Sequence, residues 1–213
     1  MDDLAIIDMA AKESNQNLSL TDKNIILITG ITEENIKSAI RAAESSTSSE
    51  NVTVGIIAGN INPLNKNMKR LSELADAVII SRENFADSSR IITESISDLV
   101  TKFGFINIEI EDVKEIFRDA GTVYFGTGTA KSAGVAALKA SEMCGDITNA
   151  KGFLLSIISG AEFPLSEMTE AAHVIEGNAD PDAQIIWGHV IDDNMSGNVR
   201  VSVFAAMNDK VRP

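Results

Sequence analysis

Short continuous apolar runs, separated by stretches with helical spacing, constrain the fold of this chain more than any other feature. In the first half, Ile25–Ile28, Val52–Ile57 and Ala77–Ile80 each have the length of one buried strand. Apolar residues between these runs fall on one face of a helix. Because strands that alternate with helices form right-handed βαβ units, this half predicts a parallel sheet covered by helices.

Two helices are predicted around the first of these strands. Residues 3–14 have helical spacing of their apolar side chains and predict a short amphipathic helix. After strand 25–28, Thr32 is the expected N-cap of the next helix. This assignment puts Glu33 and Glu34 in the first turn of that helix.

A long helix is predicted for residues 84–103, at the boundary between the two halves. Its core-facing stripe steps by four, three and four residues and consists of Ile92, Ile96, Leu99 and Phe103. At about 1.5 Å per residue such a helix is roughly 30 Å long, enough to cross a small domain. Gly104 is the expected C-cap.

The second half predicts a different arrangement, with about four strands and three helices. Its apolar runs are Thr122–Phe125, Phe153–Ile158, Ile185–Val190 and Val199–Phe204. The fold class that we predict is therefore α/β: a truncated Rossmann-like parallel sheet, joined by a central helix to an α+β domain with a four-stranded sheet. The predicted division is 1–83, 84–103 and 104–213.

Charge and composition exclude several classes of function. Asp and Glu total 31 against 18 Lys and Arg, a formal net charge of −13. Such a surface repels nucleic acid, so we expect no nucleic-acid partner. The single cysteine, Cys144, allows no internal disulfide, and no apolar run approaches the ~18 residues that cross a bilayer. We expect a cytoplasmic protein without membrane insertion.

One acidic stretch stands out between the two halves. Asn107, Glu109, Glu111 and Asp112 place one amide and three carboxylates within six residues, just before a predicted helix that starts near Glu111. Acidic residues at a helix N-terminus are common, because they complement the helix dipole. By itself this pattern favours that ordinary structural role.

The order of helix, polar loop and acidic helix start resembles the synergy loop of FtsZ, the prokaryotic tubulin homologue. The loop of that family reads Asn-x-Asp-x-x-Asp-Val, and here the residues are Asn107, Glu109, Asp112 and Val113. Further stretches of the second half are similar to the C-terminal domain of FtsZ. They are 119–128, 149–160, 185–192 and 199–206. The resemblance implies that Asn107, Glu109 and Asp112 complete the GTPase site of a neighbouring subunit in a filament.

The first half departs from the family pattern. A glycine-rich signature is expected after strand 25–28, but the chain reads Thr29-Gly-Ile-Thr-Glu33-Glu34-Asn35. Glycine loops bind phosphate through bare backbone amides, whereas carboxylates satisfy the helix dipole and repel a triphosphate. We therefore expect no cofactor, with GTP or GDP as the one ligand that the resemblance leaves open. Phe85 and Asp87 lie where the family contacts guanine, and a core Phe and a capping Asp are the favoured assignments.

Three other features are assigned ordinary structural roles. Gly126-Thr-Gly-Thr-Ala-Lys131 follows a strand and precedes a helix, but a lone Gly-x-Gly is weak evidence for a phosphate loop. His173 and His189 have no second ligand at metal spacing, so no metal site is expected. Cys144 is expected to be a buried small apolar side chain.

Three functions remain open from the sequence. The leading one is an FtsZ-like protein without a complete GTP site that assembles with itself or caps and regulates FtsZ filaments in cell division. The second is a weak GTPase with an altered or dimer-completed site, and the third is a structural scaffold outside the filament. A non-enzymatic role is favoured. The partner is expected to be an FtsZ-type protein or a second copy of the chain, since a truncated sheet leaves an edge to cover.

Overall fold

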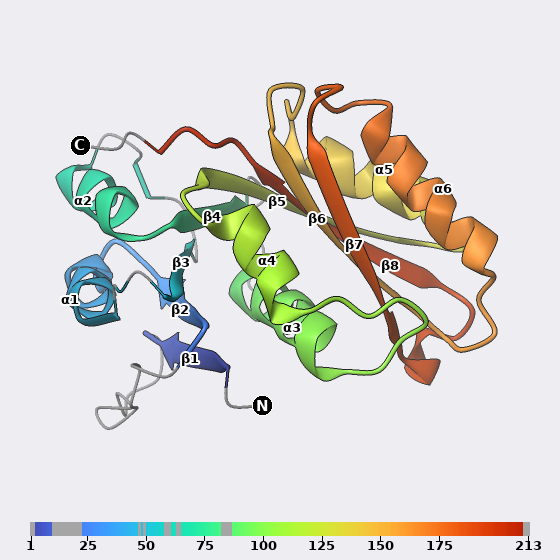
Figure 1. Cartoon of the computed structure of the whole chain (residues 1–213), viewed down its shortest axis with the longest axis horizontal. Coiled ribbons are helices and arrows are strands. Elements are labelled where there is room, and N and C mark those ends of the chain that lie inside the picture. Colours follow the sequence, from blue (N-terminus) through green and yellow to red (C-terminus); the bar gives the residue numbers. More distant parts are fainter. Residues whose placement is uncertain are drawn as a thin grey trace.

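A computed structural model describes residues 3–9, 23–46, 48, 50–57, 61–62, 65–81 and 87–210. Strands and helices alternate through the first half and again through the second (Figure 1). The strands are β1 (Leu4–Asp8), β2 (Ile25–Ile31), β3 (Val52–Ile57), β4 (Ala77–Ser81), β5 (Gly121–Ala130), β6 (Gly152–Ser159), β7 (Gln184–Ile191) and β8 (Val199–Ala206). The helices are α1 (Ile36–Ser46), α2 (Lys66–Leu74), α3 (Ser88–Thr101), α4 (Ile110–Phe117), α5 (Ala133–Cys144), α6 (Leu165–Glu176) and the 3-10 turn η1 (Asp193–Met195).

The described strands form one eight-stranded sheet in the order β1-β2-β3-β4-β5-β8-β6-β7. Each neighbouring pair from β1 to β5 is parallel. Strand β8 runs antiparallel between β5 and β6, and β7 is parallel to β6. The predicted class of a parallel half and a four-stranded α+β half is confirmed, and the β4–β5 pairing joins the two halves into a continuous sheet.

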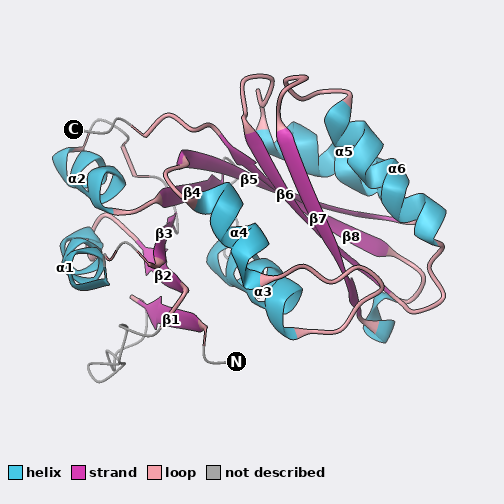
Figure 2. Ribbon diagram, in the orientation of Figure 1, coloured by secondary structure: helices cyan, strands magenta, loops and turns pink. Residues whose placement is uncertain are grey.

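Helices cover both faces of this sheet (Figure 2). Helices α3 and α4 pack on one face, where Ile92, Ile96 and Phe117 share a buried cluster with residues of β2 to β8. On the opposite face, α1 and α2 cover the parallel strands, while α5 and α6 cover the C-terminal strands. Continuous apolar runs such as Ile25–Ile28 follow from this arrangement, since strands with helices on both faces bury every side chain.

The N-terminal prediction is wrong for the residues that the structure describes. Leu4–Asp8 is a strand, not a helix, and it pairs in parallel with β2 in a register that sets Leu4 beside Ile25. The remainder of the predicted 3–14 helix lies outside the described residues, apart from Asp3 and Met9. Leu4 and Ile7 fit helical spacing, but the run Leu4–Ile7 is also continuously apolar. Pairing with a fully buried neighbouring strand outweighs that local signal.

The central helix is shorter than predicted. Helix α3 begins at Ser88 and ends at Thr101, and residues 82–86 lie outside the described part of the chain. Ile92, Ile96 and Leu99 are buried as expected, but Phe103 is 74% exposed. The C-cap is Lys102 in an extended conformation, not Gly104. The helix ends before Phe103, the fourth residue of the predicted stripe, so Phe103 belongs to the loop that follows.

The second half agrees closely with its sequence pattern. In β8, Val199, Val201 and Val203 face α5 and α6, while Ser202 faces α3 and accepts a hydrogen bond from Ser95 at 3.1 Å. The glycines of the Gly126–Lys131 stretch lie within β5 and not in a phosphate loop. A Cβ on Gly126 would lie 2.0 Å from the carbonyl oxygen of Ala140, so this glycine allows close packing of α5 on the strand. Among the described residues, no helix is long and apolar enough to cross a membrane.

Candidate functional site

The loop between α3 and α4 lies along the outer edge of β7. The backbone N–H of His189 donates to the carbonyl of Ile106 at 2.8 Å, and that of Ile191 donates to the carbonyl of Phe103 at 3.1 Å. These bonds satisfy alternate positions of β7 on the side away from β6. The loop therefore covers this edge of β7, which would otherwise present unpaired main-chain groups. We call residues 103–109 the interaction loop.

Two residues shape the first turn of the interaction loop. A Cβ on Gly104 would lie 1.6 Å from the carbonyl oxygen of His189, so any side chain here would collide with the β7 backbone. The backbone N–H of Gly104 donates to Oδ1 of Asn107 at 3.1 Å. Asn107 therefore closes the turn with its side chain, although it is exposed to solvent.

The acidic residues lie where the loop enters α4, as predicted. Glu109 is the N-cap of α4 and forms a capping box with Asp112. The backbone N–H of Glu109 donates to Oδ2 of Asp112 at 2.7 Å, and the Glu109 side chain accepts the backbone N–H of Asp112. Glu111 is bonded to Lys114, whose amine also donates to Asn24 at 3.1 Å. The structure thus brings Asn107, Glu109 and Asp112 together at one helix N-terminus. Asn107 and Glu109 are exposed to solvent, and Asp112 is half-buried.

Sequence reasoning missed a histidine beneath this loop. His189 is 1% exposed, its Nδ1 accepts the backbone N–H of Phe105 at 3.2 Å, and its Nε2 lies 2.8 Å from Oγ of Ser159. Burial lowers the pKa of His189 below its ordinary value, which favours the neutral ring. The contact joins residues 84 positions apart, so no local pattern announces it.

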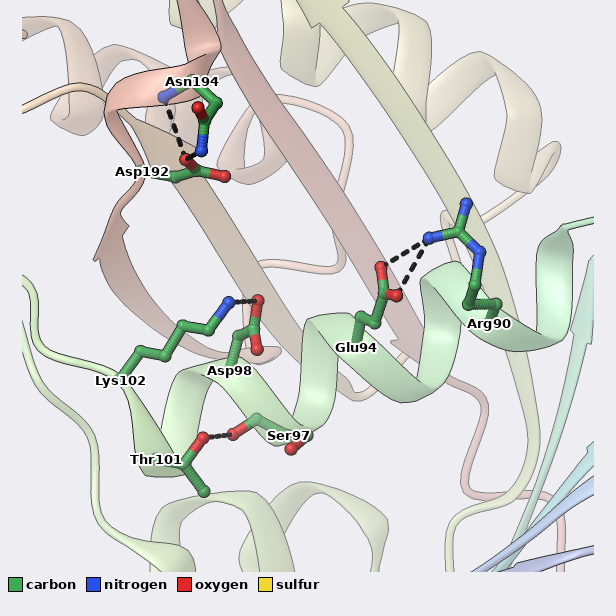
Figure 3. Close-up of polar contacts among 8 residues, drawn as sticks. All are labelled: Arg90, Glu94, Ser97, Asp98, Thr101, Lys102, Asp192 and Asn194. Atoms are coloured by element: carbon green, nitrogen blue, oxygen red, sulfur yellow. Dashed lines mark hydrogen bonds and ion pairs between the residues drawn. The ribbon is translucent and has the colours of Figure 1, made fainter.

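The charges on the exposed side of α3 are paired with one another (Figure 3). Arg90 donates to both carboxylate oxygens of Glu94 at 2.9 Å, and Lys102 donates to Asp98 at 2.8 Å. Beyond β7, the backbone and side-chain N–H groups of Asn194 bind Asp192 and hold the pKa of that carboxyl below its usual range. Asp192 follows Ile191, the β7 residue that is bonded to the loop, and adds a negative charge at this end of the molecule.

The turn after β2 differs from the prediction in its details. Helix α1 begins at Ile36, so Glu33 and Glu34 lie in the turn before the helix and not in its first turn. Asn35, and not Thr32, organises the turn. Its Oδ1 accepts the backbone N–H of Thr32 at 2.8 Å, and its Nδ2 donates to the carbonyl of Gly30 at 3.0 Å. A side-chain amide thus occupies groups that a phosphate-binding turn would leave open.

The other predicted candidates stand apart from the interaction loop. Phe85 lies outside the described residues. Asp87 precedes α3 and forms an ion pair of 3.6 Å with Arg90, with both side chains largely exposed. No group of three His, Cys, Asp or Glu side chains in the described part of the chain suits a metal ion.

Comparison with known proteins agrees with this arrangement. A model of the FtsZ family, C-terminal domain, matches residues 110–208, from the start of α4 to just past β8. An empty FtsZ dimer from M. jannaschii has a similar structure, with a TM-score of 0.74 and 23% identity. That match covers 87% of this chain and 64% of the FtsZ chain.

Two further solved structures share the fold. A point mutant of M. jannaschii FtsZ matches with a TM-score of 0.75 and 23% identity, over 88% of this chain and 66% of the other. GDP-form protofilaments of Bacillus thuringiensis serovar israelensis TubZ match at 0.52 and 9% identity, over 86% and 61%. The chain therefore spans less than two thirds of each of these three proteins. Its fold is that of FtsZ, and residues 110–208 match the C-terminal domain of the FtsZ family.

Proposed function

We propose that this chain is a cytoskeletal protein of the cell-division type that binds one end of an FtsZ filament and caps it. The observation that carries the proposal is the interaction loop with the start of α4. It is fixed to β7 by main-chain bonds and presents Asn107 and the exposed Glu109 to solvent. In FtsZ, as the resemblance implies, the matching loop sits on the nucleotide of the next subunit. A chain with this loop has the surface needed to dock on a filament end.

The turn between β2 and α1 supports capping over elongation. Elongation past the cap requires a nucleotide for the next loop to contact. Here Asn35 takes up the backbone N–H of Thr32, and the exposed Glu33 and Glu34 stand beside it. Two carboxylates near a triphosphate are unfavourable by about 1 kcal/mol for each charge pair at 4 Å in water, and more where water is excluded. A bound subunit of this kind would end the filament.

Glu109 gives the cap a second property. It stands where the family has Asp, so it keeps the charge but sets its carboxylate one methylene further from the backbone. Positioning of an attacking water depends on distances of a fraction of an ångström. We infer that the loop contacts the partner nucleotide but hydrolyses it slowly, which leaves a capped end long-lived.

The test is a titration of this chain into the FtsZ of the same cell, with GTP hydrolysis and light scattering followed together. We expect loss of both signals well below a one-to-one ratio. Glu109→Gln and Asp112→Asn remove charge and keep an acceptor, so they are preferable to Asp112→Ala, which also breaks the capping box of α4. Glu115→Gln, an exposed carboxylate further along α4, is the matched control. No effect at excess would contradict the proposal and leave the structural scaffold.

A weak GTPase is the second candidate, favoured by one observation. The turn after β2 lies at the carboxyl ends of parallel strands, where open α/β sheets bind their ligands. Equilibrium dialysis with labelled GTP separates the two candidates. The cap predicts no saturable binding by the isolated chain, whereas one GTP per chain or per dimer would favour the GTPase.

A further inference from the structure

His189 contacts the interaction loop through both its side chain and its backbone. Its ring Nδ1 accepts the N–H of Phe105, and its backbone N–H donates to the carbonyl of Ile106. The imidazole also stacks on the Phe105 ring, with centroids 5.2 Å apart and planes 6° from parallel. A single residue of β7 therefore contacts the loop at Phe105 and Ile106 and fixes its position against the strand.

The hydrogen bonds fix which ring nitrogen carries the proton. A backbone N–H can only donate, so Nδ1 beside Phe105 must be unprotonated. The neutral ring then carries its hydrogen on Nε2 and donates it to Oγ of Ser159 at 2.8 Å. The Ser159 hydroxyl can donate onward to the carbonyl of Gly160 at 3.3 Å. Only the tautomer with its hydrogen on Nε2 allows all of these hydrogen bonds to form.

The opposite arrangement is unfavourable for the loop. A ring protonated on both nitrogens, or on Nδ1 alone, would point an N–H at the N–H of Phe105. A buried donor that faces another donor costs about 1–3 kcal/mol, because neither is solvated. Phe105 is 52% exposed, so it can leave the ring without breaking the core.

We propose that His189, as the neutral Nε2–H tautomer held by Ser159, is the positioning residue that keeps the interaction loop in its docking conformation. The inference rests on the proposed function for its consequence, which is that binding to a filament end depends on a residue beneath the contact surface. Its structural part, the hold on Phe105, stands independently of any partner.

Charged side chains near the loop do not take over the positioning role of His189. Those on the elements packed around the loop and the end of β7 are Asp98 and Lys102 of α3, Asp192 and Asp193 after β7, Arg200 of β8, and Glu109 of the loop. Asp98 pairs with Lys102, and Asp192 is bonded to Asn194. The tautomer of the neutral ring follows from its two hydrogen bonds, to the N–H of Phe105 and to the hydroxyl of Ser159.

Two amide substitutions separate the roles of the ring nitrogens. His189→Asn places an amide oxygen near the position of Nδ1 and keeps an acceptor for Phe105, whereas His189→Gln reaches toward Ser159 and loses that acceptor. In the free protein we expect His189→Gln to speed hydrogen exchange at the Phe105 amide about tenfold, the equivalent of one net hydrogen bond. His189→Asn should restore most of the protection. Amides of β6 and β8 report whether the core is intact.

Ser159→Ala is the second test, and it leaves the histidine in place. Without the hydroxyl acceptor, the ring loses its preference for the hydrogen on Nε2. Ring nitrogen resonances of the wild type should show a protonated Nε2 and a bare Nδ1, and those of Ser159→Ala a mixture. Partial loss of Phe105 protection should accompany that mixture. Unchanged protection in both His189→Gln and Ser159→Ala would overturn the proposal.

The filament titration with the same variants distinguishes failure of the proposed capping function from failure of the proposed role of His189. If the loop is the contact, His189→Gln weakens capping and His189→Asn retains it. A wild type that never affects filaments, together with lost Phe105 protection in His189→Gln, would contradict the proposed function and support the positioning role. Full capping by His189→Gln despite lost protection would contradict the link between His189 and docking.

Discussion

Gly104 occupies a position where a side chain has no room. A Cβ would fall 1.6 Å from a carbonyl oxygen of β7, and that oxygen belongs to a strand and cannot move away. We expect Gly104→Ala to lift the interaction loop and lower the free energy of unfolding by roughly 1–3 kcal/mol, the usual cost of overpacking. Urea denaturation measures this change.

Gly177→Ala is the matched control for this prediction. Gly177 ends α6 with φ near −65°, and its added Cβ would meet nothing closer than 3.5 Å. We expect little loss of stability there. Equal stability of Gly104→Ala and the wild type would contradict the described path of the loop.

His189 makes the protein less stable as the pH falls. Its pKa is near 6.5 when unfolded and lower when folded, because burial disfavours the charged ring. As pH falls below about 6.5, the unfolded chain binds a proton first, so the free energy of unfolding falls until the pH passes the folded pKa. The pH dependence from this ring fades about one unit above the unfolded pKa, where both states are neutral. His189→Asn should flatten this slope in denaturation curves at several pH values, and an unchanged slope would contradict the buried neutral ring.

Helix α3 depends on a buried stripe, of which Ile96 is a fully buried member. We expect Ile96→Ala to lower the free energy of unfolding by about 2–5 kcal/mol, from lost burial and the cavity left behind. Leu138→Ala on α5 is the control, because that leucine is 47% exposed and its truncation removes little buried area. Chemical denaturation compares the two, and similar losses would contradict the assigned burial.

Elements with a strong local signal could be predicted from the sequence. The run Ile25–Ile28 and the strictly alternating residues of β8 each have one structural solution in a sheet with helices on its faces. Strand β1 could not be predicted, because its four apolar residues fit either structure and only the pairing with β2 decides. The end of α3 was misplaced by two residues, and that shift moved Phe103 from the predicted core to the surface.

The candidate site was only partly predictable. Asn107, Glu109 and Asp112 were found because they are neighbours in sequence and match a family pattern. His189 and Ser159 were missed because they come from β7 and β6 and meet the loop only after the sheet forms. The closing role of Asn35 was missed because Thr32 is an equally good N-cap by residue type. Side-chain contacts across elements need the fold before they can be assigned.

At the scale of the whole molecule, β1 forms one edge of the sheet. Within the described residues, β1 pairs only with β2. An unpaired strand edge favours pairing with another chain. We therefore expect a homodimer or larger assembly. Sedimentation velocity over a wide concentration range checks this, and a single monomeric species at high concentration would contradict it.

A cap occupies one end of a filament and no other position. The most direct measurement is fluorescence microscopy of single FtsZ filaments mixed with a labelled form of this chain, with the label on exposed Val135 of α5 after its substitution by Cys. The account predicts one labelled end per filament, and loss of that label with Glu109→Gln. Label spread along the filament, or no label on any filament, would contradict capping through the interaction loop.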